Sequence, residues 1–284
     1  MIIIRLTGGL GNQMFQYAAA RCLALKNGAE LKLDTTAYRE DQLRNFDLFC
    51  LNIKASIATP AEIDALKAKG TAGRVMSYLT PYPRRKFYKQ PWFRFHPSFF
   101  RLTDPVYLQG YFQSEKYFEA EREQVQKDFT IKKELTANAE PLAAGLQAQE
   151  SVALHIRRGD YRNDVSLDYH GIVPLDYYRE AVEQVSSKVA HPHFYIFSDD
   201  GAWVKENLKL PKATIVSGEL SSTHFEDLYL MSRCRHNIIA NSSFSWWAAW
   251  LNANPEKIVI APRHWFNKGP KDTEDLIPGE WTRT

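Results

Sequence analysis

Hydrophobic and polar residues alternate along the chain in a way that predicts parallel strands joined by helices. Near the N-terminus, an apolar run at 2–6 is followed by a glycine-rich turn, a helical stretch at 13–26 and a second apolar run at 31–34. Strand, helix and strand in this order form a βαβ unit. The turn at 8–13 lacks the glycine spacing of dinucleotide-binding loops, and a tight turn without a ligand explains it equally well.

The second half of the chain repeats this alternation more regularly. Short buried strands are expected at 152–156, 194–197, 214–216, 237–240 and 258–260, and helices at 175–187, 202–207, 225–233 and 244–251. Repeated strand–helix–strand units give right-handed crossovers and a parallel sheet. Two α/β lobes with a cleft between them are therefore predicted.

The middle of the chain, residues 60–150, is less regular. Helical pieces at 60–69 and 115–128 flank a segment at 82–101 that is dense in proline, aromatic and basic residues. Such a segment suits contact with sugar rings or a membrane surface, but buried aromatics beneath solvated charges are the favoured interpretation. The Ala-, Gln- and Glu-rich stretch at 137–150 predicts an interlobe helix and a boundary near residue 150.

Composition excludes several classes of protein. The 284 residues are 44% hydrophobic and 24% charged, which is typical of a folded globular chain rather than a disordered or coiled-coil one. A net charge of +3 is too small to indicate a nucleic-acid partner. Cys22, Cys50 and Cys234 lie far apart without metal-ligand spacing, so we expect thiols in a reducing compartment.

The N-terminal apolar run is interrupted by Arg5 and the glycines that follow, so no signal peptide is expected. No stretch approaches the roughly 20 apolar residues that a membrane-spanning helix needs. These features indicate a cytoplasmic enzyme, and peripheral association with the inner membrane is left open.

Polar residues follow three of the predicted strands, where ligands bind in open parallel sheets. The strand at 152–156 contains His155 and leads into Arg157 and Arg158. Two fork-shaped guanidinium groups suit a diphosphate and would stabilise its charge as it leaves. The structural alternative is an ion pair with Asp160, which we expect of one arginine but not of both.

A second anion site is predicted at 241–245, where serines precede a helix whose N-terminal dipole and N–H groups favour negative charge. Ser243 and Ser245 are the candidate phosphate contacts. Ser242 or Ser243 also suits an N-cap, a role compatible with ligand binding. The tryptophans that follow are assigned to the core.

Three carboxylates are more ambiguous. Asp199 and Asp200 lack the further ligands that a metal site needs, and their place before a predicted helix suits an N-cap, so no metal site is predicted. Asp227 suits hydrogen bonding to a guanine edge, although a solvated helix carboxylate is the default interpretation.

Four segments together resemble the motifs of the bacterial and animal α-1,2-fucosyltransferases, glycosyltransferase family 11. They are GGLGNQMFQY (8–17), HIRRGDY (155–161), FSDD (197–200) and NSSFSWW (241–247). The resemblance implies an α/β fold of the GT-B type, with two Rossmann-like lobes facing a central cleft. Residues 1–150 would form the acceptor-side lobe, and residues 151–284 the lobe that binds the GDP-sugar.

The resemblance also implies an activity. An inverting transferase of this kind moves L-fucose from GDP-β-L-fucose to the 2-hydroxyl of a terminal β-galactose, on an oligosaccharide or a lipid-linked glycan, without a metal or another cofactor. A transferase that uses another GDP-sugar remains an alternative. A non-catalytic carbohydrate- or nucleotide-binding protein is the alternative from a different class.

Residue roles follow from the same resemblance. Arg157 and Arg158 would act on the diphosphate, and Asn12 would lie near the fucose or the acceptor hydroxyl. The donor-binding residues would be His155, Asp160, Asp227, Ser243, Phe244 and Ser245. The general base is open between Asp164, Asp168 and His170, and a base is unnecessary if GDP leaves first.

Overall fold

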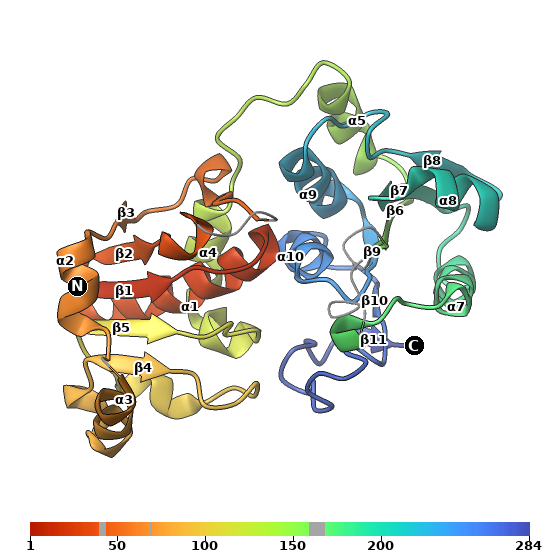
Figure 1. Ribbon diagram of the computed structural model, residues 1–284. Helices are drawn as coiled ribbons and strands as arrows, with labels where there is room; N and C mark the ends of the chain where they lie inside the picture. Colours follow the sequence, from red (N-terminus) through yellow and green to blue (C-terminus); the bar gives the residue numbers. More distant parts are fainter. Residues whose placement is uncertain (40–43, 69, 159–167) are drawn as a thin grey trace. The chain divides into compact units, whose positions relative to one another are not determined.

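The computed structural model describes residues 1–39, 44–68, 70–158 and 168–284. The chain divides into two compact units, residues 1–132 with 272–276, and residues 133–271 with 277–284. Each unit contains one sheet whose strands are all parallel, five-stranded in the first unit and six-stranded in the second (Figure 1). The predicted α/β class with two Rossmann-like units is confirmed.

The first unit begins with the predicted βαβ unit. Strand β1 (Ile2–Arg5) leads into α1 (Leu10–Asn27) and then β2 (Leu31–Asp34), which pairs with β1 in parallel. Helix α1 ends at Gly28, where the left-handed φ of 58° favours glycine. The backbone N–H of Gly28 donates to carbonyls of the last helical turn. Local sequence therefore sets the C-terminal end of this helix.

The rest of the first sheet has the order β3-β2-β1-β5-β4. Its further elements are η1 (Thr36–Arg39), η2 (Leu48–Cys50), β3 (Ser56–Ile57), α2 (Pro60–Leu66), α3 (Gly70–Leu79), η3 (Tyr82–Arg84), β4 (Phe87–Lys89), η4 (Pro97–Arg101), β5 (Val106–Gln109), η5 (Glu115–Tyr117), η6 (Glu119–Glu121) and α4 (Arg122–Asp128). Strands β3, β4 and β5 and helix α3 were not predicted. The helix expected at 115–128 is continuous only over α4.

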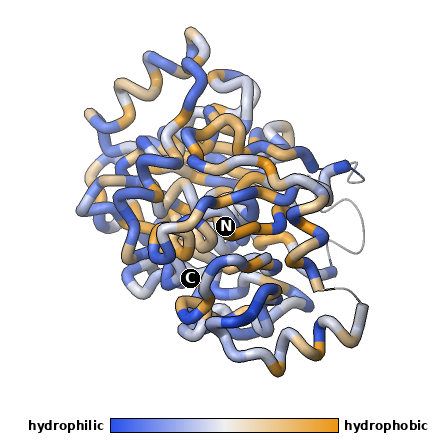
Figure 2. The backbone as a smooth tube through the Cα atoms, turned by 90° about the vertical axis from the view of Figure 1, so that its left-hand side faces the viewer, coloured by the Kyte–Doolittle hydropathy of each residue, from blue (hydrophilic) through white to orange (hydrophobic). Residues whose placement is uncertain are grey.

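Aromatic side chains from the irregular segment form much of the first unit's interior. Phe99, Phe112 and Tyr117 are fully buried, and their ring centroids lie 5.1–5.4 Å apart. The hydrophobic and hydrophilic stretches can be followed along the chain in Figure 2. Within 82–101 the favoured interpretation is confirmed for Phe87, Tyr88 and Phe99, which are buried, whereas Trp92 is 68% exposed.

The second unit follows the predicted order closely. Its sheet has the strand order β11-β10-β9-β6-β7-β8. The elements are α5 (Ala139–Leu146), β6 (Ser151–Ile156), α7 (Leu175–Ser186), β7 (His193–Ser198), α8 (Gly201–Asn207), β8 (Ala213–Ile215), α9 (His224–Arg233), β9 (His236–Ile238), α10 (Ser243–Leu251), β10 (Val259–Ala261) and β11 (Thr282–Arg283). Trp246, Trp247 and Trp250 of α10 are buried, as predicted.

The division between the units falls at residues 132 and 133, earlier than the boundary predicted near 150. Helix α5 packs against α9 within the second unit. The Thr136 amide donates to the Glu226 carboxylate at 2.7 Å, and Arg233 donates to Gln147 at 3.0 Å. These bonds explain why residues 133–150 belong with the second sheet.

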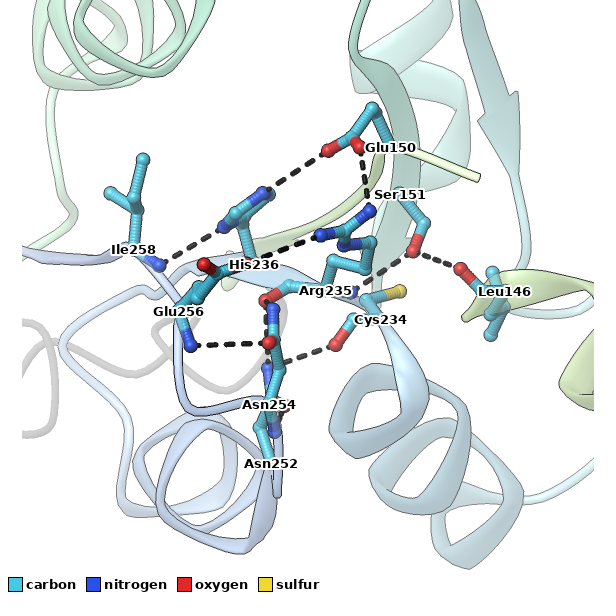
Figure 3. Close-up of polar contacts among 10 residues, drawn as sticks. All are labelled: Leu146, Glu150, Ser151, Cys234, Arg235, His236, Asn252, Asn254, Glu256 and Ile258. Atoms are coloured by element: carbon cyan, nitrogen blue, oxygen red, sulfur yellow. Dashed lines mark hydrogen bonds and ion pairs between the residues drawn. The ribbon is translucent and has the colours of Figure 1, made fainter. Parts of the chain in front are cut away.

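Polar side chains tie together the amino ends of β6 and β9 (Figure 3). Glu150 accepts from Arg235 at 2.6 Å, and the His236 Nδ1 accepts from the Ile258 amide at 3.0 Å. The Asn252 side chain donates to the Cys234 carbonyl at 2.8 Å. These contacts hold the amino edge of the sheet and leave its carboxyl edge to carry other chemistry.

All three cysteines are buried and form no disulfide, as predicted, and each lies within the described part of the chain. Among the residues that the structure describes, no helix is both long and apolar enough to cross a membrane.

A buried carboxylate links α1 to α4 in the first unit. Asp128 accepts from the Tyr17 hydroxyl at 2.6 Å and pairs with the Arg21 Nε at 2.9 Å. The same Tyr17 hydroxyl accepts from the Lys54 amide at 2.8 Å. One hydroxyl thus serves two partners in the interior.

We predict that Tyr17→Phe lowers the free energy of unfolding of the first unit by about 1–3 kcal/mol, because a buried acceptor and a buried donor lose their partner. Urea unfolding followed by circular dichroism measures this change. The matched control is Tyr111→Phe, where the ring is 47% exposed and little change is expected. Equal midpoints for Tyr17→Phe and wild type would contradict the prediction.

Candidate active site

Two arginines after β6 meet two aspartates after β7. The strands are parallel and in register, with Ile156 opposite Ser198, so the residues that follow them are adjacent. The Arg157 Nε lies 3.1 Å from Asp199 Oδ2, and the Arg158 Nε lies 3.6 Å from Asp200 Oδ2. The expected partner, Asp160, lies outside the described residues. Both guanidinium groups are therefore oriented by carboxylates of the neighbouring strand.

Arg158 is held in two further ways. Its guanidinium carbon lies 3.9 Å from the centre of the Trp203 ring, a cation–π contact. Its backbone N–H donates to Asp199 Oδ1 at 2.8 Å. The side chain is about one quarter exposed, at 26%. Backbone, stacking and charge together hold this guanidinium at the end of β6.

Asp200 caps helix α8, as predicted for this pair of aspartates. Its carboxylate accepts from the Trp203 amide at 3.1 Å, while its own amide donates to the Ser198 hydroxyl at 3.0 Å. Within the described ranges, no group of three or more His, Cys, Asp or Glu side chains is placed to hold a metal ion. The observed role of these aspartates is to cap a helix and orient arginines.

His155 and Phe244 come together from β6 and α10. Their ring centroids lie 5.9 Å apart, and His155 is only 5% exposed. Burial, with the nearby Arg157 charge, lowers the pKa of His155 from 6.5 to about 3. The buried Nδ1 has no hydrogen-bond partner among the described residues. The ring is thus neutral at pH 7 and has an unsatisfied polar atom.

Asp227 belongs to a hydroxyl network that joins α9 to the end of β7. The Ser217 hydroxyl donates to one oxygen of the Asp227 carboxylate at 2.7 Å, and the Ser221 hydroxyl donates to the other. Burial raises the pKa of Asp227. Ser217 also accepts from the Ser198 amide at 3.1 Å. Sequence reasoning missed Ser217 and Ser221; the position of Ser217 just after β8 was a signal that could have found it.

Some residues of the 241–245 segment hold the surrounding backbone in place, and others are partly exposed. Asn241 donates to the carbonyls of His170, Gly171 and Trp265 at 3.0–3.2 Å, which braces the loops around it. Ser242 is the N-cap of α10 and accepts from the Phe244 amide at 3.3 Å.

The two predicted phosphate contacts differ in accessibility. Ser245 is fully buried, and its hydroxyl donates to the Ser242 carbonyl at 3.3 Å. Ser243, at the first position of α10, is partly exposed. The structure therefore gives Ser245 a supporting contact within the first turn of the helix and leaves Ser243 at the surface.

The candidate bases are placed unequally. Asp168 is exposed and lies 2.5 Å from the Lys268 ammonium. The His170 ring packs on Phe266, with centroids 5.7 Å apart, and the Asn241 bond holds the His170 backbone beside the end of β9. Asp164 lies outside the described residues.

The glycine turn of the first unit is built around buried amides. Gly8 has a φ of 78°, and a Cβ there would lie 2.6 Å from the Asn12 amide nitrogen. Gln13 is fully buried and donates to the Gly8 carbonyl at 3.0 Å. Gln16 is also buried, and its side-chain oxygen accepts from the backbone N–H of Thr7, just before the turn. Asn12 is partly exposed, and its Oδ1 accepts from Gln113 at 2.8 Å.

The low pKa of His155 predicts a pH dependence of stability. As pH falls from 6.5 towards 3, His155 is protonated in the unfolded chain but stays neutral in the folded protein. The free energy of unfolding therefore falls. This loss reaches about 1.4 kcal/mol per pH unit in wild type and is absent from His155→Gln. Unfolding midpoints between pH 7 and 4 measure it. The exposed His264→Gln is the control, and parallel profiles for wild type and His155→Gln would contradict the prediction.

Comparisons with known proteins find relatives over the whole chain. The family model for glycosyl transferase family 11 matches residues 1–284. An α-1,2-colitosyltransferase of Escherichia coli is 31% identical, over 100% of this chain and 98% of that protein. The O-antigen biosynthesis glycosyltransferase WbnK of Escherichia coli is 32% identical, over 92% of this chain and 93% of its own length.

An animal relative and a solved structure extend the comparison. The galactoside α-(1,2)-fucosyltransferase 2 of Oryctolagus cuniculus is 26% identical, over 88% of this chain and 67% of that protein. The crystal structure of the α-1,6-fucosyltransferase NodZ with GDP matches with a TM-score of 0.50 and 14% identity, over 87% of this chain and 90% of NodZ. That likeness supports the GT-B type of fold. The chain is a glycosyltransferase and belongs to glycosyl transferase family 11.

Proposed function

We propose that this chain transfers L-fucose from GDP-β-L-fucose to the 2-hydroxyl of a terminal β-galactose and inverts the anomeric configuration. The observation that carries the proposal is the pair Arg157 and Arg158 at the carboxyl end of β6, oriented by Asp199 and Asp200. The names of the α-1,2-transferring relatives support the linkage, and the galactoside named for the rabbit relative supports the acceptor.

The donor nucleoside would be bound by the second unit. His155 offers a neutral ring whose buried Nδ1 lacks a partner among the residues that the structure describes, and a ribose or phosphate oxygen would supply one. The carboxylate of Asp227 would accept from the guanine N–H edge, with its orientation fixed by two serine hydroxyls. The partly exposed Ser243 and the α10 amides, beside Phe244, would contact phosphate.

The reaction would proceed by departure of GDP. As the bond between the fucose anomeric carbon and the phosphate oxygen breaks, negative charge grows on the diphosphate, and fixed guanidinium groups stabilise it. Because Arg157 and Arg158 supply that charge, we propose that no metal is required and that the rate persists in EDTA. The acceptor 2-hydroxyl attacks the opposite face of the sugar.

The acceptor proton has several candidate destinations. Asp164, Asp168 and His170 all follow the arginine motif, and a late loss to solvent after GDP departs needs none of them. Asp168 is engaged with Lys268, so its use as a base would require that ion pair to open. In the first unit, which we assign to the acceptor, Asn12 would donate its amide to the fucose or the acceptor hydroxyl.

The cellular setting follows as part of the proposal. A GDP-sugar donor and three buried thiols without disulfides suit the cytoplasm. The acceptor would be a galactose-terminated oligosaccharide or lipid-linked glycan.

We predict that Arg157→Ala reduces kcat by about 10²-fold or more, because the charge that stabilises the departing diphosphate is lost. Arg157→Lys restores activity only in part, since an ammonium cannot form the planar fork. Steady-state transfer to a β-galactoside is the measurement. Arg179→Ala, an exposed arginine of α7, is the matched control and keeps the wild-type rate. A near-normal kcat for Arg157→Ala would remove the main support for the proposal.

A second donor has specific support, because the E. coli α-1,2-colitosyltransferase matches the whole chain at 31% identity. Colitose differs from L-fucose by lacking the 3-hydroxyl. We predict a higher kcat/KM for GDP-fucose than for GDP-colitose with the same β-galactoside, and an α-1,2 linkage in the product by NMR. A preference for GDP-colitose would reassign the donor and retain the mechanism, whereas another linkage would reject the acceptor site.

A further inference from the structure

Helix α3 (Gly70–Leu79) turns its large apolar side chains towards solvent. Val75, Met76 and Leu79 are 53%, 64% and 73% exposed. With the exposed Ala72, they occupy positions i, i+3, i+4 and i+7 of the helix, so they form one continuous stripe. Such a stripe normally faces the core of a protein, and here it does not.

The orientation of α3 is fixed by its small and polar side. The Ser77 hydroxyl donates to the Phe87 carbonyl of β4. Arg85 is buried and donates to the carbonyls of Tyr78 and Thr80, at 3.0 and 2.9 Å, at the end of the helix. Figure 1 shows α3 beside β4, the edge strand of the first sheet. Polar contacts therefore hold the helix with its apolar stripe outward.

Positive charge is concentrated in the same part of the chain. Residues 65–103 contain nine of the 36 Lys and Arg residues and none of the 33 Asp and Glu residues. Arg74 lies on α3, and Arg84 and Lys86 follow it; all three are exposed. We call the apolar stripe together with these three cations the α3 patch. The rest of the chain has more acidic than basic residues.

The combination selects one kind of partner. An exposed apolar stripe beside several cations is the pattern of a helix that lies in the interface of an anionic membrane. A symmetric dimer through this face would bring like charges together, which opposes self-association. We propose that the α3 patch binds the surface of an anionic lipid bilayer, with the stripe in the headgroup–acyl boundary and the cations among the headgroups.

The proposal concerns attachment and is independent of the donor sugar and of catalysis. The full chain is expected to co-sediment with vesicles of phosphatidylcholine and phosphatidylglycerol, but not with phosphatidylcholine alone, and to be released by high salt. Met76→Gln with Leu79→Gln is expected to lower the partition coefficient about tenfold or more, because apolar contact is lost. Leu25→Gln, on the exposed side of α1, is the matched control and should bind normally.

A charge variant tests the other half of the patch and keeps the proposal testable if the apolar variant is unstable. Arg74→Gln with Lys86→Gln should weaken binding severalfold more than Lys127→Gln with Lys188→Gln, which removes as much charge from exposed positions elsewhere. Equal losses in the two charge variants would show unspecific attraction and overturn the proposal. So would absent binding by wild type, or a concentration-dependent dimer that Met76→Gln with Leu79→Gln abolishes.

Discussion

The alignment of Arg157 and Arg158 with Asp199 and Asp200 is the interaction on which the site depends. It arises from the parallel register of β6 and β7. The same spacing along the two strand ends brings each arginine next to its aspartate. Each guanidinium group faces a carboxylate, which offsets its positive charge before any ligand is bound. The carboxylates also restrict the side chains, so less conformational entropy is lost when an anion is gripped.

The segment after β7 shows how one short stretch serves several purposes. Asp200 caps α8, and the capped helix presents Trp203 to the guanidinium of Arg158. Ser198 connects the same strand end to the hydroxyl network of Asp227 through Ser217. Loss of one of these residues would therefore disturb several groups at once, and mutational effects within this segment are expected to be non-additive.

Buried polar residues explain much of the motif composition. Gln13 and Asn241 satisfy backbone groups at two turns, and Ser245 does so within the first turn of α10. A buried backbone group without a partner is costly, so these positions demand a particular side chain without touching a substrate. Asn12 and Ser243 lie in the same segments and remain partly exposed, which makes them the better candidates for ligand contact.

The sequence predicts elements well where a single buried run is bounded by polar residues, as at β6 and β7. It fails at β5, which lies between β1 and β4 in the sheet but follows a segment dense in proline and aromatic residues that hides the strand pattern. The ion pair between Arg157 and Asp199 could not be predicted either. It depends on the register between two strands, which neither segment reveals by itself. The Ser217 and Ser221 contacts with Asp227 were missed for a related reason, since they join a loop to a helix.

Periodicity alone could not assign α3 either, because it reveals that a helix has an apolar side but not which side faces the protein. Here the edge position of β4 leaves room for a helix on its flank, and Ser77 and Arg85 decide which side of α3 is used. Because residues 65–103 contain no acidic residue, the exposed side of this region is positively charged in addition to carrying an apolar stripe. Both properties favour an anionic, partly apolar surface, and a lipid bilayer offers the two together.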